Sequence, residues 1–234
     1  MLLSQEHKRF CLDNLAIHYQ TVVNGQGEVL KYELLSRLPE SSGIDSLESF
    51  FGDLTPEESI EVAFKQIERS RDIFNATGLV CSINVDNIVL VEDSLKKRLL
   101  NACASHDHPL ILEFTEIRPM PPAEEINALF FALKKQGISI ALDDFGTGFN
   151  GMSIFADYDF DIIKIDRSLI TGIQTRPQKL YILSHMLDLM NALEKQHIVE
   201  GVESMAQFEQ LRDIGFDAFQ GFLFHRPGPV EELL

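Results

Sequence analysis

Short apolar runs alternate along the chain with longer segments of helical periodicity. The short runs are rich in β-branched and aromatic residues and are bounded by turn residues, a pattern that predicts β-strands. The first two runs are joined by Asn24-Gly25-Gln26-Gly27, which is typical of a hairpin turn, so we expect these two strands to be antiparallel. Eight strands are predicted, over residues 15–23, 29–37, 79–85, 110–116, 138–143, 161–166, 197–202 and 216–222.

Helices are predicted between the later strands from their start and stop signals. One begins at Thr55-Pro56-Glu57-Glu58, which combines an N-cap threonine, a proline at the first helical position and a glutamate three residues on, and it ends at Gly78. Three more are predicted over residues 122–136, 178–196 and 204–214. Eight strands with about six intervening helices favour an α/β fold, a (β/α) barrel with an irregular start. An open doubly wound sheet is the alternative fold. It ranks second because that fold would be expected to carry a glycine-rich phosphate loop, which the sequence lacks.

Composition and charge restrict the classes of partner and the location that we expect for this protein. Of the 234 residues, 45% are hydrophobic and 24% charged, the balance of a soluble globular protein. Twenty Lys and Arg against thirty-six Asp and Glu give a net charge of −16, which excludes polymeric nucleic acid and membrane surfaces as partners. The three cysteines show no C-x-x-C spacing and the first ten residues are unlike a secretory signal, so we expect a cytoplasmic protein. Without a linker, residues 1–234 are expected to form one domain.

Polar residues interrupt the apolar runs near the carboxyl ends of the strands. Each alone is more often a helix cap or a surface ion pair, but the same intrusion recurs on one strand after another. In a parallel barrel these ends meet at one mouth, where only cations would make so many carboxylates tolerable. Hard oxygen ligands without Cys or His suit Mg²⁺ or Mn²⁺, and they are enough for two ions. The interrupting residues are Glu33, Asn84, Glu113, Glu116, Asp143, Asp144, Lys164, Asp166, Glu200, Glu203 and Gln220.

These residues lie in segments that resemble one known family. The signature Tyr32-Glu33-Leu34-Leu35-Ser36-Arg37 resembles that of the EAL-domain cyclic di-GMP phosphodiesterases, and the likeness is strongest at Leu142-Asp143-Asp144-Phe145-Gly146-Thr147-Gly148-Phe149. Further matches follow in order up to Pro227, at residues 163–168, 199–203 and 220–222. The resemblance implies a TIM-like (β/α)8 barrel whose first strand is antiparallel to the rest. It also implies hydrolysis of cyclic di-GMP to linear pGpG with Mg²⁺ or Mn²⁺.

The resemblance also implies roles for individual residues. One ion would be held by Glu33, Asn84, Glu113 and Asp143, and a second by Asp143, Asp144 and Glu200. The implied catalytic residues are Lys164, which would hold the attacking water, Glu200, as general base or ligand, and Gln220 and Glu203 in support. Substrate contacts are implied for Gln20, Leu35, Arg37, Asp166 and Pro227. Glu116 resembles the glutamate that anchors the loop after Asp144, which in this family links the site to a dimer interface.

The sequence departs from the family pattern at a few positions. The signature reads Glu-Leu-Leu rather than Glu-Ala-Leu, Thr21 replaces a usual proline, and residues 149–153 differ from the usual loop. The acidic ligands and the lysine are all retained. An active, stand-alone phosphodiesterase is therefore expected, as a homodimer with a possible regulatory protein partner. The alternatives are an inactive cyclic di-GMP receptor or protein-binding adaptor and, more distantly, an unrelated metal-dependent barrel acting on a phosphorylated metabolite.

Overall fold

Eight strands close into a barrel because β1 pairs with both β2 and β8. The computed structural model describes residues 4–115, 119–147 and 151–234. Strand β1 is antiparallel to both neighbours, whereas the pairs from β2 to β8 are parallel, so the predicted TIM-like barrel with an antiparallel first strand is confirmed. The strands are β1 Ala16–Asn24, β2 Val29–Arg37, β3 Val80–Val85, β4 Leu110–Thr115, β5 Ile138–Phe145, β6 Ile162–Ile165, β7 Gln196–Val199 and β8 Ala218–Gln220, with a short β9, Gly228–Pro229, beside β1.

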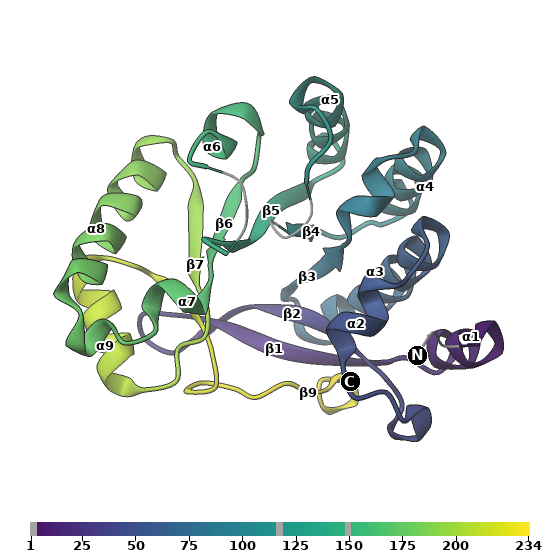
Figure 1. Ribbon diagram of the computed structural model, residues 1–234, viewed down its shortest axis with the longest axis horizontal. Helices are drawn as coiled ribbons and strands as arrows, with labels where there is room; N and C mark the ends of the chain where they lie inside the picture. Colours follow the sequence, from purple (N-terminus) through teal and green to yellow (C-terminus); the bar gives the residue numbers. More distant parts are fainter. Residues whose placement is uncertain (1–3, 116–118, 148–150) are drawn as a thin grey trace.

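Helices lie outside most of the strands, whereas the segment that contains β9 runs beside β1 (Figure 1). The four predicted helices are present with ends within a few residues of those expected, and the capping box of Thr55 and Glu58 begins the longest of them. Three others of six residues or more were not predicted, α1, α2 and α4. The last of these starts after Glu92, which makes no side-chain cap. The helices are α1 Gln5–Asp13, α2 Leu47–Gly52, α3 Pro56–Thr77, α4 Asp93–Ala104, α5 Ala123–Lys134, α6 Ile154–Asp157, α7 Arg167–Ile170, α8 Pro177–Ala192 and α9 Met205–Ile214.

The interior of the barrel has an apolar layer and a polar layer. Side chains alternate between the two faces of a strand, so residues two apart both point inward. The apolar layer is a buried cluster drawn from six strands: Val22, Ile111, Ala141, Ile162, Ile198 and Ala218. Two positions nearer the carboxyl ends of the parallel strands, the same face carries Glu113, Asp143, Lys164, Glu200 and Gln220. The alternate residues of these strands, such as Leu112 and Ile163, belong to the main core shared with the helices.

Strands β7 and β8 end two or three residues earlier than predicted, and this affects the candidate site. Strand β7 ends at Val199 and β8 at Gln220, so Glu200 and Glu203 lie in the loop after β7. That loop approaches β8 closely, since a Cβ built on Gly221 would lie 2.1 Å from the carbonyl oxygen of Val202. The described helices include none that is long and apolar enough to cross a membrane.

Candidate active site

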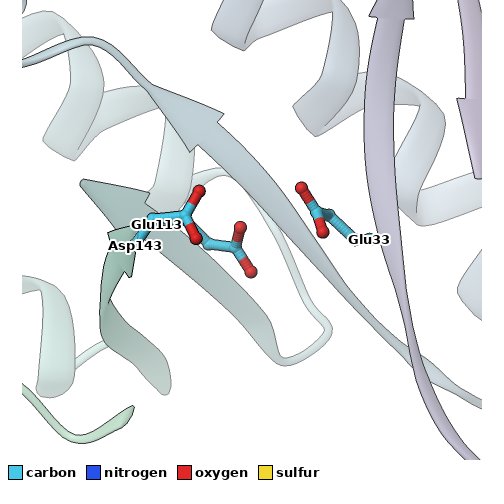
Figure 2. A group of neighbouring side chains, drawn as sticks. All are labelled: Glu33, Glu113 and Asp143. Carbon is cyan, nitrogen blue, oxygen red and sulfur yellow. The ribbon is translucent and has the colours of Figure 1, made fainter. Parts of the chain in front are cut away.

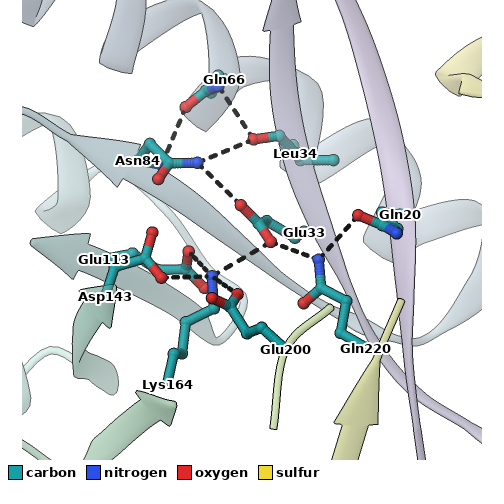
Figure 3. Close-up of polar contacts among 10 residues, drawn as sticks. All are labelled: Gln20, Glu33, Leu34, Gln66, Asn84, Glu113, Asp143, Lys164, Glu200 and Gln220. Atoms are coloured by element: carbon teal, nitrogen blue, oxygen red, sulfur yellow. Dashed lines mark hydrogen bonds and ion pairs between the residues drawn. The ribbon is translucent and has the colours of Figure 1, made fainter. Parts of the chain in front are cut away.

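The ammonium group of Lys164 lies at the centre of the polar layer and contacts four carboxylates (Figure 3). Its Nζ is 2.7 Å from Glu113 Oε2 and 2.8 Å from Glu200 Oε1. It is also 2.9 Å from Asp143 Oδ1 and 3.2 Å from Glu33 Oε2. These residues come from five strands or strand ends, and Lys164 is only 1% exposed. The barrel thus brings together side chains as far apart in sequence as Glu33 and Glu200.

The carboxylates form two overlapping groups of the kind that could hold metal ions. Glu33, Glu113 and Asp143 make the first (Figure 2), and Asp143, Asp144 and Glu200 the second; within each group the oxygens lie within 4.8 Å of one another. Adjacent residues of a regular strand point to opposite faces, so Asp143 and Asp144 would be separated in one. Here the pairing with β6 shifts register between Leu142 and Phe145, and Asp144 has a φ of 57°. This bulge brings both carboxylates into the site.

The acidic residues of this cluster repel one another and are partly desolvated, so nearby cations would stabilise their charged forms. Burial raises the pKa of Glu113 to about 8, with the charges of Glu33 and Asp143 adding to the shift. Burial followed by the charge of Asp143 raises the pKa of Asp144 to about 6. Five carboxylates against one ammonium leave a net formal charge of −4 in a partly desolvated space. Oxygen donors in two such groups fit Mg²⁺ or Mn²⁺, which would offset this charge and keep the carboxylates ionised.

Glu33 is held differently from the other acids, by a chain of amide groups. Burial alone would raise its pKa, but Lys164 and the hydrogen bonds from Gln220 and Asn84 outweigh burial and keep the pKa below its usual value. Gln220 Nε2 donates to Glu33 Oε2 over 2.6 Å and also to Gln20 Oε1 over 3.1 Å. Asn84 Nδ2 donates to Glu33 Oε1 over 3.2 Å, which leaves the Asn84 carboxamide oxygen available to a cation.

Gln66, which was not among the predicted site residues, holds the backbone of Asn84 in place. Gln66 of α3 is 1% exposed, and its Oε1 accepts a hydrogen bond from the backbone N–H of Asn84 over 3.2 Å. Its Nε2 donates to the carbonyl oxygen of Leu34 and to Ser36 Oγ, both over 3.1 Å. One amide therefore joins the helix to β2 and β3 beside two of the predicted metal ligands. The available signal was a polar residue within the buried stripe of α3, between Ala63 and Ser70.

Two pockets open above the cluster and share Glu33, Leu35 and Asp143. One, of about 400 Å³, includes Arg37, Asn84 and an apolar wall from α2 and α3. The other, of about 290 Å³, is lined by Gln20, Asp144, Asp166, Glu200, Glu203 and Gln220, among others.

The remaining predicted site residues are less closely joined to the cluster. Glu203 is exposed, and Asp166 caps α7 by accepting from the backbone N–H of Ser168 over 2.8 Å. Pro227 precedes β9 and lines neither pocket. Glu116 and residues 148–150 lie outside the described residues.

Known proteins share this combination of fold and sequence. The family model for the EAL domain matches residues 5–227. A probable cyclic di-GMP phosphodiesterase of Escherichia coli strain K12, PdeG, is 30% identical over 229 residues, which covers 89% of this chain and 44% of PdeG. The crystal structure of an EAL domain protein from Listeria monocytogenes EGD-e has a TM-score of 0.85 at 26% identity and covers 100% of this chain and 97% of that one. The PaMucR phosphodiesterase, solved as a c-di-GMP complex, has a TM-score of 0.84 at 26% identity, with 98% of both chains covered.

The fold and the site define a TIM-like barrel with an acidic mouth suited to divalent cations. The chain belongs to the EAL domain family, as the family model and the relatives together show, and the family predicted from the sequence is confirmed. The chain spans less than half the length of the first curated relatives it matches.

Proposed function

We propose that this chain hydrolyses cyclic di-GMP to linear pGpG in a reaction that depends on Mg²⁺ or Mn²⁺. The observation that supports the proposal is the presence of two sets of acidic residues around Lys164, each able to hold a metal ion, with Asp143 in both sets. Membership of the EAL domain family supports the substrate, since relatives are named cyclic di-GMP phosphodiesterases. A homodimer, a regulatory protein partner and a cytoplasmic location remain predictions.

The proposed reaction adds one water to one of the two phosphodiester groups. The water oxygen attacks phosphorus, the bond from phosphorus to the ribose 3′ oxygen breaks, and the product keeps a 5′ phosphate. Glu200 would accept one proton of the attacking water, and Lys164 would donate a hydrogen bond that orients this water. The departing 3′ oxygen would take up a proton from solvent and leave as a hydroxyl group. Arg37, at the wall of the larger pocket, would pair with a phosphate oxygen. Gln20, Leu35 and Asp166 would contact the substrate from the edges of the two pockets.

The ions have a defined place in this proposal. Glu33, Asn84, Glu113 and Asp143 would hold one, and Asp143, Asp144 and Glu200 the other. Bound divalent ions would supply Lewis-acid stabilisation of charge on the phosphate and a lower pKa for the attacking water. Glu203 and Gln220 would help to keep the loop after β7 and the end of β8 in place.

Product analysis tests the proposal directly. The protein is incubated with cyclic di-GMP and Mg²⁺ or Mn²⁺, and the nucleotides are separated by chromatography, with a parallel sample in EDTA. We expect pGpG with either metal and none in EDTA. Glu33→Gln and Glu200→Gln are expected to lower the rate by orders of magnitude. Glu209→Gln, an exposed acid on α9, serves as the control and should leave the rate unchanged.

Recovery of intact cyclic di-GMP over a range of both metals would overturn the proposal. Calorimetry then distinguishes the alternatives. Tight binding of the intact nucleotide would indicate a receptor, and no binding would indicate a different ligand or a protein-binding role.

A further inference from the structure

A second large hollow lies at the opposite end of the barrel from the acidic cluster. It has a volume of about 690 Å³ and is bounded by the β1–β2 turn, the starts of β7 and β8 and the ends of α8 and α9. The turn lies against α9, because a Cβ built on Gly25 would be 3.7 Å from Arg212 Cδ. We call this the basal hollow. Because the parallel strands start here and end at the acidic mouth, the barrel's apolar layer separates the two sites.

The basal hollow is basic, although the chain carries a net charge of −16. Lys31, Lys195 and Arg212 line it with one acid, Asp217, a local net charge of +2. Within the described ranges, neither Lys31 nor Arg212 forms an ion pair. Lys195 has only a long contact, 3.7 Å to Asp159. The Asp217 side chain is 80% exposed and lies 3.3 Å from His197 Nδ1 rather than on a lysine or arginine.

A purely structural role does not explain a lysine at position 31. It lies two positions before Glu33 on β2, at the level where neighbouring strands contribute Val80, Ile111 and other apolar residues. Its side chain is half-buried. Desolvating an ammonium that forms no ion pair is unfavourable, and a methionine would fill the same volume without that penalty. An anion in the basal hollow would offset the penalty.

We propose that the basal hollow binds a small phosphate-bearing molecule of nucleotide size through Lys31, Lys195 and Arg212. A guanidinium donates two hydrogen bonds to a phosphate in a fixed geometry, and lysines add compact positive charge. The volume is within the range of pockets that enclose such ligands. This proposal does not depend on the phosphodiesterase activity, because it uses none of the residues around Lys164.

Calorimetry in excess EDTA tests the basal hollow without metal-bridged binding at the acidic mouth. The probes are inorganic phosphate and adenosine monophosphate, added to the whole chain. We expect one site, with tighter binding of the nucleotide than of phosphate. Arg212→Gln and Lys31→Met should each weaken binding about tenfold or more, since each removes a charged contact to phosphate. The matched control is Arg98→Gln, because Arg98 is also an exposed helical arginine over a phenylalanine ring but lies on α4, outside the hollow.

Several outcomes would overturn this proposal. One is no heat with either probe at millimolar concentration. Another is equal affinity in wild type, Arg212→Gln and Lys31→Met, and a third is binding that Glu200→Gln abolishes, which would place the anion at the acidic mouth. If Lys31→Met changed only metal affinity and not phosphate affinity, Lys31 would serve the acidic cluster instead. Thermal unfolding checks the variants, and Lys31→Met is expected to melt no lower than wild type in the absence of ligand.

Discussion

Gln66 accepts a hydrogen bond from the backbone of Asn84, so a residue in the middle of helix α3 fixes the strand end that carries a predicted metal ligand. The same side chain donates to the carbonyl oxygen of Leu34, which directly follows Glu33. Gln66 therefore fixes the positions of Asn84 and Glu33 relative to each other through the backbone. It hydrogen-bonds neither the Glu33 carboxylate nor the Asn84 side-chain amide. We infer that it is a positioning residue.

Replacing Gln66 by methionine should raise the metal requirement more than it lowers the maximal rate. The variant keeps the volume but removes the side-chain acceptor of the Asn84 N–H and one of two side-chain donors to the Leu34 carbonyl, at a cost of about 1–3 kcal/mol in the free energy of unfolding. We expect about a tenfold higher Mn²⁺ concentration at half-maximal activity, with a rate at saturating Mn²⁺ within several-fold of wild type. Activity is measured as a function of Mn²⁺ concentration at saturating cyclic di-GMP.

Gln178→Met, an exposed glutamine on α8, is the control and should change neither quantity. If Gln66→Met lost stability but kept the wild-type Mn²⁺ dependence, Gln66 would have a structural role only.

The fold could be predicted largely from sequence because its signals are local. The strand runs are apolar on both faces, and Thr55 and Glu58 mark a helix start without reference to the rest of the chain. Helix α4 was missed because its N-cap Glu92 makes no capping hydrogen bond. The ends of β7 and β8 were set too late because the apolar pattern continues through Val202 and Phe222, after the ladder has stopped.

The candidate site was predictable in its residue types but not in its contacts. The acidic residues could be read from strand ends, whereas the position of Lys164 among four of them depends on barrel closure. The presence of Asp143 and Asp144 on one side depends on a bulge that no periodicity reveals. Pro227 lines neither pocket and precedes β9, which pairs with β1, so its contact with the substrate stays a prediction.

Glu58 is expected to make stability depend on pH in the acidic range. Burial would raise its pKa, but hydrogen bonds from Thr55 and the ion pair with Lys8 outweigh burial and lower it. A lowered pKa means that the stabilisation is complete above the unfolded-state pKa and is lost as the pH falls through the folded-state value. Glu58→Ala should therefore cost about 1 kcal/mol at pH 7, and the difference from wild type should shrink below about pH 4.5.

Urea denaturation at several pH values measures this effect. Glu58→Gln is the matched control, because glutamine can keep the cap but carries no charge, so its curve should meet that of wild type at low pH. A difference between Glu58→Ala and wild type that stayed constant from pH 7 to pH 3 would contradict the assignment.

The two sets of acidic residues that share Asp143 predict how many metal ions the wild type and each site variant should bind. Mn²⁺ titration by calorimetry should give two ions per chain in wild type. Glu113→Gln should remove the ion of the first group alone, and Glu200→Gln that of the second. Asp143→Asn should weaken both, because Asp143 is shared. Glu209→Gln should still bind two. One ion in wild type, lost equally in all three site variants, would show that the carboxylates act as a single site.

Lys164→Met should destabilise the metal-free protein strongly and the metal-bound protein much less. Without the ammonium, four carboxylates that contact it lose their cation in a buried space, and breaking such a cluster costs about 3–5 kcal/mol. Divalent ions at the same oxygens would replace that charge, so the stabilisation by Mn²⁺ should be larger in the variant than in wild type. Urea denaturation in EDTA and in excess Mn²⁺ measures both values, with Lys97→Met, an exposed lysine on α4, as the control. If Mn²⁺ restored none of the lost stability, the carboxylates around Lys164 would not be the metal ligands, and the proposed reaction would lose its basis.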